Sequence, residues 1–210
     1  MKRIHVTGTA GCIESHRHIA LAGSGFATVG LGNFHNRKPK TIRCIDSLIC
    51  GWLPIRETNI DNQATRPNVL AEKAIDAVVH LMGLKAVGDS VTQFLDYYES
   101  NAQGTPSLRR AMAKADVYTL AFSSSAAAYG ATHTLPVHEG SRAPTSDPRE
   151  CSKIIVEKAL SGLKSSSPRW GFPRLRYFHP VDTPPRGRVR EIPNGIPKNL
   201  MPYVYEAESE

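Results

Sequence analysis

A glycine-containing turn that follows a single apolar segment near the N-terminus constrains the fold of this chain more than any other feature. The segment "RIHVTG" is one strand long, and the turn "GTAG" then leads into a helix expected over residues 11–23. Gly8 gives the tight backbone geometry that such a turn needs, and Gly11 lets the backbone approach a pyrophosphate held at the helix N-terminus. A glycine pair alone is weak evidence, but its position at the start of the chain favours a dinucleotide-binding unit.

Apolar, partly β-branched segments alternate with amphipathic ones along the chain, which predicts βα units and a parallel sheet. The expected strands are "RIHVTG", "FATVGLG", "AIDAVVHLMG", "VYTLAFSSS" and "PRLRYFHP". Helices are expected over residues 11–23, 92–114 and 150–165. The second of these should bend or break at Gly104 and Pro106. The predicted fold class is α/β, with a Rossmann-like doubly wound parallel sheet over residues 1–180 and the start of a small C-terminal substrate subdomain over residues 181–210.

Composition and charge are those of an ordinary globular chain with a basic surface. Hydrophobic residues make up 40% of the chain and charged residues 21%, and the net charge is +7. No apolar run is long enough to span a membrane, and the N-terminus lacks the apolar stretch of a signal peptide. Cys12, Cys44, Cys50 and Cys151 form no CxxC pair and no zinc spacing with histidine. We therefore expect reduced thiols in the cytoplasm and no metal site.

The densest basic cluster is "PPRGRVR", residues 184–190. It is too short and too rich in proline for a nucleic-acid-binding helix, and no alternation of aromatic and basic residues supports a single-strand platform. We expect no nucleic-acid partner, because a phosphate-bearing small molecule suits this cluster as well as DNA does.

Six stretches spread over nearly all 210 residues carry a resemblance to a known family. They are "MKRIHVTGTAGCIESH", "AVVHLMGLKAVGDSV", "YYESNAQGT", "LAFSSSAAAYG", "LRYFHPV" and "PNGIPKNLMPYV". In these stretches the chain resembles the UDP-glucose 4-epimerases, which belong to the extended short-chain dehydrogenase/reductase superfamily. The resemblance implies an isomerase of galactose metabolism that holds NAD and oxidises C4 of a UDP-hexose. After the keto sugar rotates, hydride returns to its other face.

The resemblance also implies roles for single residues. The implied cofactor-binding residues are Gly8, Gly11, Ile13, Asn33, Asn59, Ile60, Lys85, Asn101, Ser123, Lys153 and Tyr177. The implied substrate-binding residues are Ser125, His179 and Asn199. Ser125, the last of a serine run, would hydrogen-bond the 4-hydroxyl of the sugar, and Lys153 would hold the nicotinamide ribose and lower the pKa of a catalytic tyrosine. Without the family context, a polar turn that caps a strand would be the favoured explanation of the serine run, and a solvated helix lysine that of Lys153.

The chain departs from the family pattern at several of these positions. Glu14 stands at the third glycine of the turn, and Gly32 and Asn59 replace acids that grip the adenosine. His179 replaces an asparagine on the substrate side. Each lost hydrogen bond to a charged group costs about 1.5–3 kcal/mol, so we expect weaker NAD binding. In "RECSK" the position of the catalytic tyrosine is held by Arg149, whose guanidinium cannot accept a proton.

Three functions remain open on the sequence. The first is an epimerase-like protein that is impaired or inactive because of Arg149, and the second is an active epimerase with a substitute base. The third is a non-catalytic nucleotide-binding or interaction protein whose basic face meets an acidic partner. The resemblance further implies a homodimer paired through the helices expected over residues 92–114 and 150–165, and a C-terminal region beyond Glu210. We therefore expect a half-built sugar pocket, in either a short natural product or a fragment.

Overall fold

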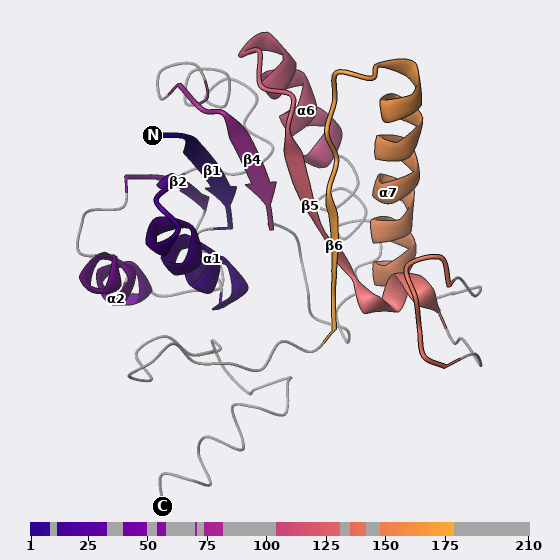
Figure 1. Cartoon of the computed structure of the whole chain (residues 1–210), viewed down its shortest axis with the longest axis horizontal. Coiled ribbons are helices and arrows are strands. Elements are labelled where there is room, and N and C mark those ends of the chain that lie inside the picture. Colours follow the sequence, from indigo (N-terminus) through magenta and orange to yellow (C-terminus); the bar gives the residue numbers. More distant parts are fainter. Residues whose placement is uncertain are drawn as a thin grey trace, which may run out of the picture.

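The computed structural model describes residues 1–8, 12–32, 40–49, 54–57, 70, 74–81, 104–130, 135–141 and 148–178. Its elements are β1 (Arg3–Thr7), α1 (Cys12–Gly23), β2 (Ala27–Gly32), α2 (Lys40–Leu48), β3 (Ile55–Glu57), β4 (Ala77–His80), α6 (Gly104–Lys114), β5 (Leu120–Ser125), the 3-10 helix η2 (Ala126–Tyr129), α7 (Pro148–Ser166) and β6 (Arg174–Tyr177) (Figure 1). The predicted substrate subdomain, residues 181–210, lies outside the described residues.

The strands form one parallel sheet in the order β3-β2-β1-β4-β5-β6. This confirms the predicted α/β, Rossmann-like class. The chain moves outward from β1 to β3 and then crosses to β4 on the other side of β1. In open sheets of this kind, ligands bind beyond the carboxyl ends of the strands at the point where the order reverses. That point lies here between β1 and β4.

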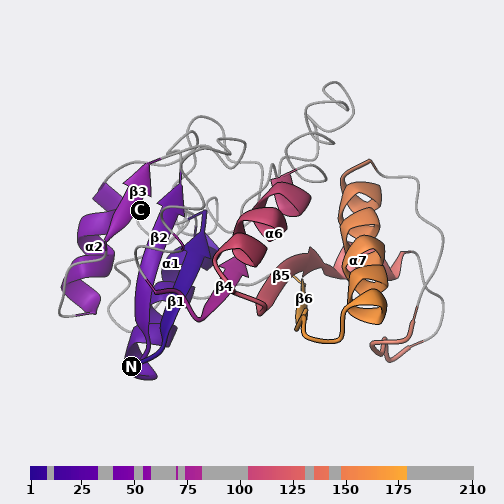
Figure 2. The ribbon, with the colours of Figure 1, turned by 90° about the horizontal axis from the view of Figure 1, so that it is seen from above.

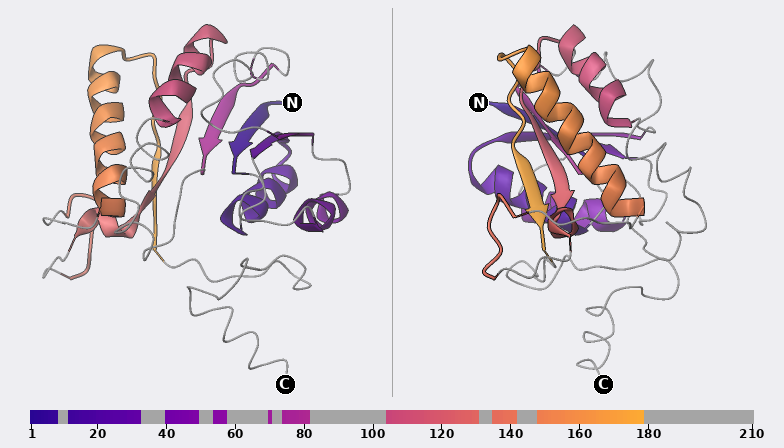
Figure 3. Two further views of the ribbon diagram at one scale, coloured as in Figure 1. Left: turned by 180° about the vertical axis from the view of Figure 1, so that it is seen from behind. Right: turned by 90° about the vertical axis from the view of Figure 1, so that its right-hand side faces the viewer.

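Helices pack on both faces of the sheet. On one face α1 contributes Ile13 and Leu21 to a cluster with Ile4, Val6 and Leu81. On the other face α6 and α7 pack against a larger cluster; its buried members are Val29, Leu70, Ile75, Val78, Leu108, Ala111, Met112, Val117, Leu120, Phe122, Val156, Leu160 and Trp170. Seen from above, α1 and α2 lie beside β1 and β2, whereas α7 lies at the β5–β6 end (Figure 2). The second view of Figure 3 shows α7 running along β5 and β6.

The predicted strands all appear, but three of the described elements, α2, β3 and η2, were not predicted. The helix α2 follows β2, and its apolar residues Ile42, Ile45 and Leu48 recur at helical spacing, so its sequence did carry a usable signal. The strand β3 has only three residues, "IRE", and it exists because it pairs with β2 at Gly30–Gly32. The described helix α6 begins at Gly104, with Pro106 in its first turn, where the missing N–H costs no helical hydrogen bond.

Candidate dinucleotide and sugar site

The turn after β1 has the conformation that a glycine favours. Gly8 has φ +84°, which lies in the left-handed region, and its N–H donates to the carbonyl of Leu31 on β2 at 2.7 Å. The helix α1 then begins at Cys12, so its N-terminus lies at the carboxyl edge of the sheet. Gly11 lies outside the described residues. Ile13 packs its side chain against the apolar cluster under α1.

Glu14 occupies the position where the resemblance expects the third glycine. It lies in the first turn of α1 and is only 2% exposed. A Cβ atom placed on Gly8 would stand 3.0 Å from Oε1 of Glu14 and 3.2 Å from its Cγ. The third glycine of a dinucleotide turn normally permits close packing of helix on strand. A buried carboxyl at this point takes up the room for that packing, whereas Gly8 keeps the backbone conformation that the turn needs.

The serine run ends β5 at the carboxyl edge. Ser123 and Ser124 are buried, at 7% and 4% exposure, and Ser125 is half-buried. Ser125 caps η2, because its Oγ accepts the N–H of Ala127 at 3.2 Å. A hydroxyl that accepts one hydrogen bond still carries a proton that it can donate to a ligand. Ser125 is also the register partner of Tyr177 on β6, so these two predicted site residues lie side by side.

Lys153 reaches the same edge from α7. Its Nζ donates to the carbonyl of Ser123 at 3.1 Å and lies 5.0 Å from the centre of the Phe122 ring. The solvated-lysine interpretation is therefore wrong, since the ammonium group is held at the end of β5. Arg149 is the second residue of α7, and its side chain lies outside the described residues.

A buried ion pair that the sequence analysis missed lies beside the serine run. Nη2 of Arg176 is 2.7 Å from Oε2 of Glu157, and the two side chains are 10% and 3% exposed. Nε of Arg176 donates to Oε1 at 3.0 Å, and the hydroxyl of Ser124 also donates to Oε1. Burial raises the pKa of Glu157, but the hydrogen bonds from Arg176 and Ser124 and the guanidinium charge outweigh it, so the pKa is lowered. The hydrogen bond to Glu157 in turn raises the pKa of Arg176.

This pair holds α7 in register with the sheet. Glu157 follows Lys153 by one helical turn, so both side chains lie on the face of α7 that meets β5. Arg176 also donates to the carbonyl of Glu139 at 3.0 Å and lies over the ring of Tyr129 at 4.6 Å. The spacing of Lys153 and Glu157 was a usable signal, but nothing local pointed to Arg176.

A second long-range contact joins α1 to β6. Nε and Nη2 of Arg17 both donate to the hydroxyl of Tyr177, at 3.0 and 2.7 Å. Tyr177 also packs against the apolar cluster under α1, whereas Arg176 points to α7, as alternation along a strand requires. Contacts with α1 therefore fix the position of the Tyr177 side chain, which the resemblance implies to be a cofactor-binding residue.

Gly11, Asn33, Asn59, Ile60, Lys85, Asn101, His179 and Asn199 lie outside the described residues. Phe178 follows Tyr177 and is 64% exposed. Its ring stacks with that of Tyr129, with 6.1 Å between the ring centres. In the part of the chain that the structure describes, no group of three or more His, Cys, Asp or Glu is arranged to hold a metal ion, and no helix is long and apolar enough to cross a membrane.

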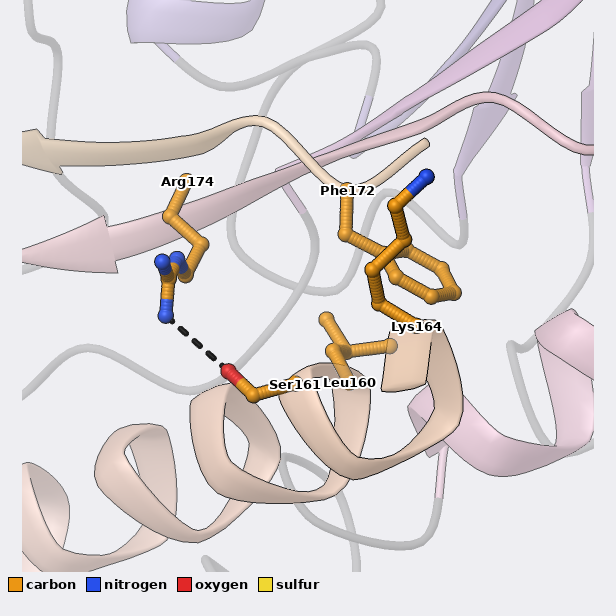
Figure 4. Close-up of a pocket in the computed structure, with 5 residues that line it drawn as sticks. All are labelled: Leu160, Ser161, Lys164, Phe172 and Arg174. Carbon is orange, nitrogen blue, oxygen red and sulfur yellow. Dashed lines mark hydrogen bonds between the residues drawn. The ribbon is translucent and has the colours of Figure 1, made fainter. Parts of the chain in front are cut away.

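A cavity of about 280 Å³ lies elsewhere, between α7 and the start of β6. It is lined by Leu160, Ser161, Lys164, Phe172 and Arg174 (Figure 4). Both cations are engaged, because Arg174 donates to Oγ of Ser161 at 3.0 Å and Lys164 donates to the carbonyl of Pro168 at 2.7 Å. None of the predicted site residues lines this cavity, so the carboxyl edge remains the candidate site.

Known proteins are similar to this chain in both sequence and fold. A UDP-glucose 4-epimerase from Bacillus subtilis is 40% identical over 201 residues, which are 96% of this chain and 59% of that protein. The corresponding protein of Neisseria meningitidis serogroup C is 38% identical over 205 residues, or 97% of this chain and 60% of its own length. The chain thus spans about 60% of the length of the curated relatives that it matches.

Two solved structures of such relatives superpose on this chain. The UDP-glucose 4-epimerase of Bifidobacterium longum, in complex with NAD+ and UDP, has a TM-score of 0.95 and 34% identity, and covers 99% of this chain and 62% of its own. The UDP-glucose-4-epimerase of Stenotrophomonas maltophila, with bound NAD and formylated UDP-arabinopyranose, has the same TM-score at 32% identity. That match covers 100% of this chain and 62% of the other. The model of the NAD dependent epimerase/dehydratase family matches residues 4–192. The chain therefore belongs to the NAD dependent epimerase/dehydratase family.

Proposed function

We propose that this chain is a UDP-glucose 4-epimerase-like domain that binds a nucleotide sugar and has little or no epimerase activity. The observation that carries the proposal is the contact between Lys153 Nζ and the carbonyl of Ser123, which holds an ammonium group beside Ser125 at the carboxyl end of β5. Relatives with 38–40% identity are UDP-glucose 4-epimerases, and solved relatives hold NAD and UDP. A UDP-hexose is the substrate class that follows.

The proton-transfer step is where the activity should fail. Ser125 can donate a hydrogen bond to a sugar hydroxyl, and Lys153 can hold a ribose hydroxyl, but neither takes the place of a tyrosine base. Arg149 stands where the family has that base, and a guanidinium keeps its proton at any pH at which proteins are stable. Loss of a general base costs about 10²–10⁴-fold in rate.

We extend the proposal to the setting of the protein. Cys44 and Cys151 are thiols, which supports a cytoplasmic location. Residues 1–180 would form the NAD-binding domain and residues 181–210 the entry to the substrate-binding region. A homodimer would pair through α6 and α7, and size-exclusion chromatography with light scattering would test this pairing.

Restoring the base tests the proposal. We would assay conversion of UDP-glucose to UDP-galactose by the whole chain and by its Arg149→Tyr variant, with Lys2→Tyr at an exposed position just before β1 as the control. Conversion by Arg149→Tyr alone is the expected result. Full activity of the unmodified chain would instead establish a substitute base. Failure of the chain to bind either NAD or UDP at millimolar concentration would overturn the proposal.

A further inference from the structure

The side chain of Glu14 is folded back into the corner between β1 and α1. It is 2% exposed, although it starts from the first turn of a helix whose N-terminus faces the carboxyl edge. Three of its atoms line the open side of Gly8: Oε1, Cγ and Cδ lie 3.0, 3.2 and 3.4 Å from the position of a Cβ on Gly8. The carboxyl group therefore fills the space that the glycine leaves open.

In a dinucleotide turn the first glycine gives the tight bend, and the third permits close packing of the helix on the strand. The pyrophosphate binds at the N-terminus of the same helix, where the positive end of the helix dipole faces it. An acidic side chain in the first helical turn benefits from the same dipole. In this chain the Glu14 side chain fills the helix–strand contact beside Gly8, and its carboxyl group lies in the first turn of α1, the end of the helix that a pyrophosphate would face.

We propose that Glu14 sets the cofactor affinity of this chain by acting as an internal occupant of the dinucleotide turn. The inference rests on the proposed function, since it concerns NAD binding at the same site. Its volume keeps helix and strand from the close packing of the third-glycine position, and its acidic group opposes the charge of the pyrophosphate. Stability of the free chain and affinity for NAD therefore depend on residue 14 in opposite directions.

Because a change at residue 14 should move NAD affinity and stability in opposite directions, both are measured on the whole chain. Calorimetric titration with NAD+ should show weak binding by the unmodified chain and binding about tenfold tighter or more by Glu14→Gly. Glu14→Gln, which removes the charge and keeps the volume, should recover part of this gain. The melting temperature without ligand should fall in Glu14→Gly, because a packed side chain is lost and glycine is added to a helix. Glu139→Gln, an exposed change of the same charge, should alter neither readout.

The outcomes separate the inference from the proposed function. Tight NAD+ binding by the unmodified chain, unchanged in Glu14→Gly, overturns the inference and leaves the proposed function standing. Absence of binding in both, with cooperative melting of both, overturns the inference and also counts against NAD binding by the chain. If Glu14→Gly does not fold, Glu14→Ala replaces it, since alanine removes the same carboxyl and favours the helix.

Discussion

The guanidinium of Arg17 on α1 and the phenol of Tyr177 on β6 meet across the carboxyl edge of the sheet, 160 positions apart in the sequence. Two of the Arg17 nitrogens donate to one hydroxyl oxygen, and the guanidinium carbon lies 5.5 Å from the centre of the ring. The contact joins the last described strand, β6, to the first helix, α1, so both elements at the candidate site are held by the same hydrogen bonds.

Removing the hydrogen bonds between Arg17 and Tyr177 should destabilise the fold moderately. Arg17→Leu and Tyr177→Phe should each lower the free energy of unfolding by about 1–2 kcal/mol, and the double variant should lose less than the sum of the two. Urea denaturation of the four proteins would measure the coupling. Lys2→Leu, at an exposed position just before β1, is the control and should have little effect. Additive losses would show that the two side chains do not act together.

The buried pair of Glu157 and Arg176 should be far more costly to break. Glu157→Gln leaves a nearly buried guanidinium without its carboxylate, and we expect a loss of about 3–5 kcal/mol in unfolding free energy. Asp116→Asn is the matched control, since Asp116 pairs with Arg169 at 3.9 Å with side chains 87% and 61% exposed. That exposed pair should contribute at most about 1 kcal/mol. Equal losses in chemical denaturation would contradict the proposed role of burial.

Two buried histidines should make the fold sensitive to acid. Burial lowers the pKa of His5 to about 4, against the opposing effect of a hydrogen bond with the Val29 backbone. Burial also lowers the pKa of His18 to about 3, and the charge of His5 lowers it further. Below the unfolded pKa of 6.5 the unfolded chain binds more protons, so stability should fall as the pH drops from 6.5 towards 4 and 3. Above 6.5 the two histidines should have no effect on the pH dependence. Glu157 adds to the acid loss, because its own lowered pKa makes its stabilisation disappear as it is protonated.

The dependence of the unfolding free energy on pH shows whether the two histidines cause the acid sensitivity. Each unit of pKa difference is worth about 1.4 kcal/mol, so a loss of a few kcal/mol is expected between pH 7 and 5. In His5→Leu and His18→Leu the unfolding free energy should vary less over this range, whereas the exposed His138→Gln should retain the full slope. An unchanged slope in both leucine variants would assign the acid loss to other groups.

Lys153 should be required only once a base is present. In the Arg149→Tyr background, Lys153→Met should reduce conversion of UDP-glucose by about 100-fold or more, because the ammonium at the end of β5 would be lost. Lys2→Met, at an exposed position just before β1, is the control and should leave the rate unchanged. Equal rates in the two double variants would remove Lys153 from the site.

Local patterns in the sequence were sufficient for the βα framework. Alternating apolar segments predicted five of the six strands, and the residue type at Gly8 predicted a turn that indeed has a positive φ. These features depend on neighbours along the chain, so their signal lies within a few residues. The short β3 escaped prediction because its stability comes from pairing with β2 rather than from its own residues.

The contacts that build the candidate site were decided by the tertiary structure. Sequence alone identified Ser125, Lys153 and Glu14 as positions of interest, but not that Lys153 reaches the carbonyl of Ser123 or that Glu14 turns inward onto Gly8. The partners of Glu157 and Tyr177 were likewise invisible, because they depend on which strand lies beside which helix. Such pairs join residues that are distant along the chain, and only the order and register of the parallel sheet bring them within hydrogen-bonding distance.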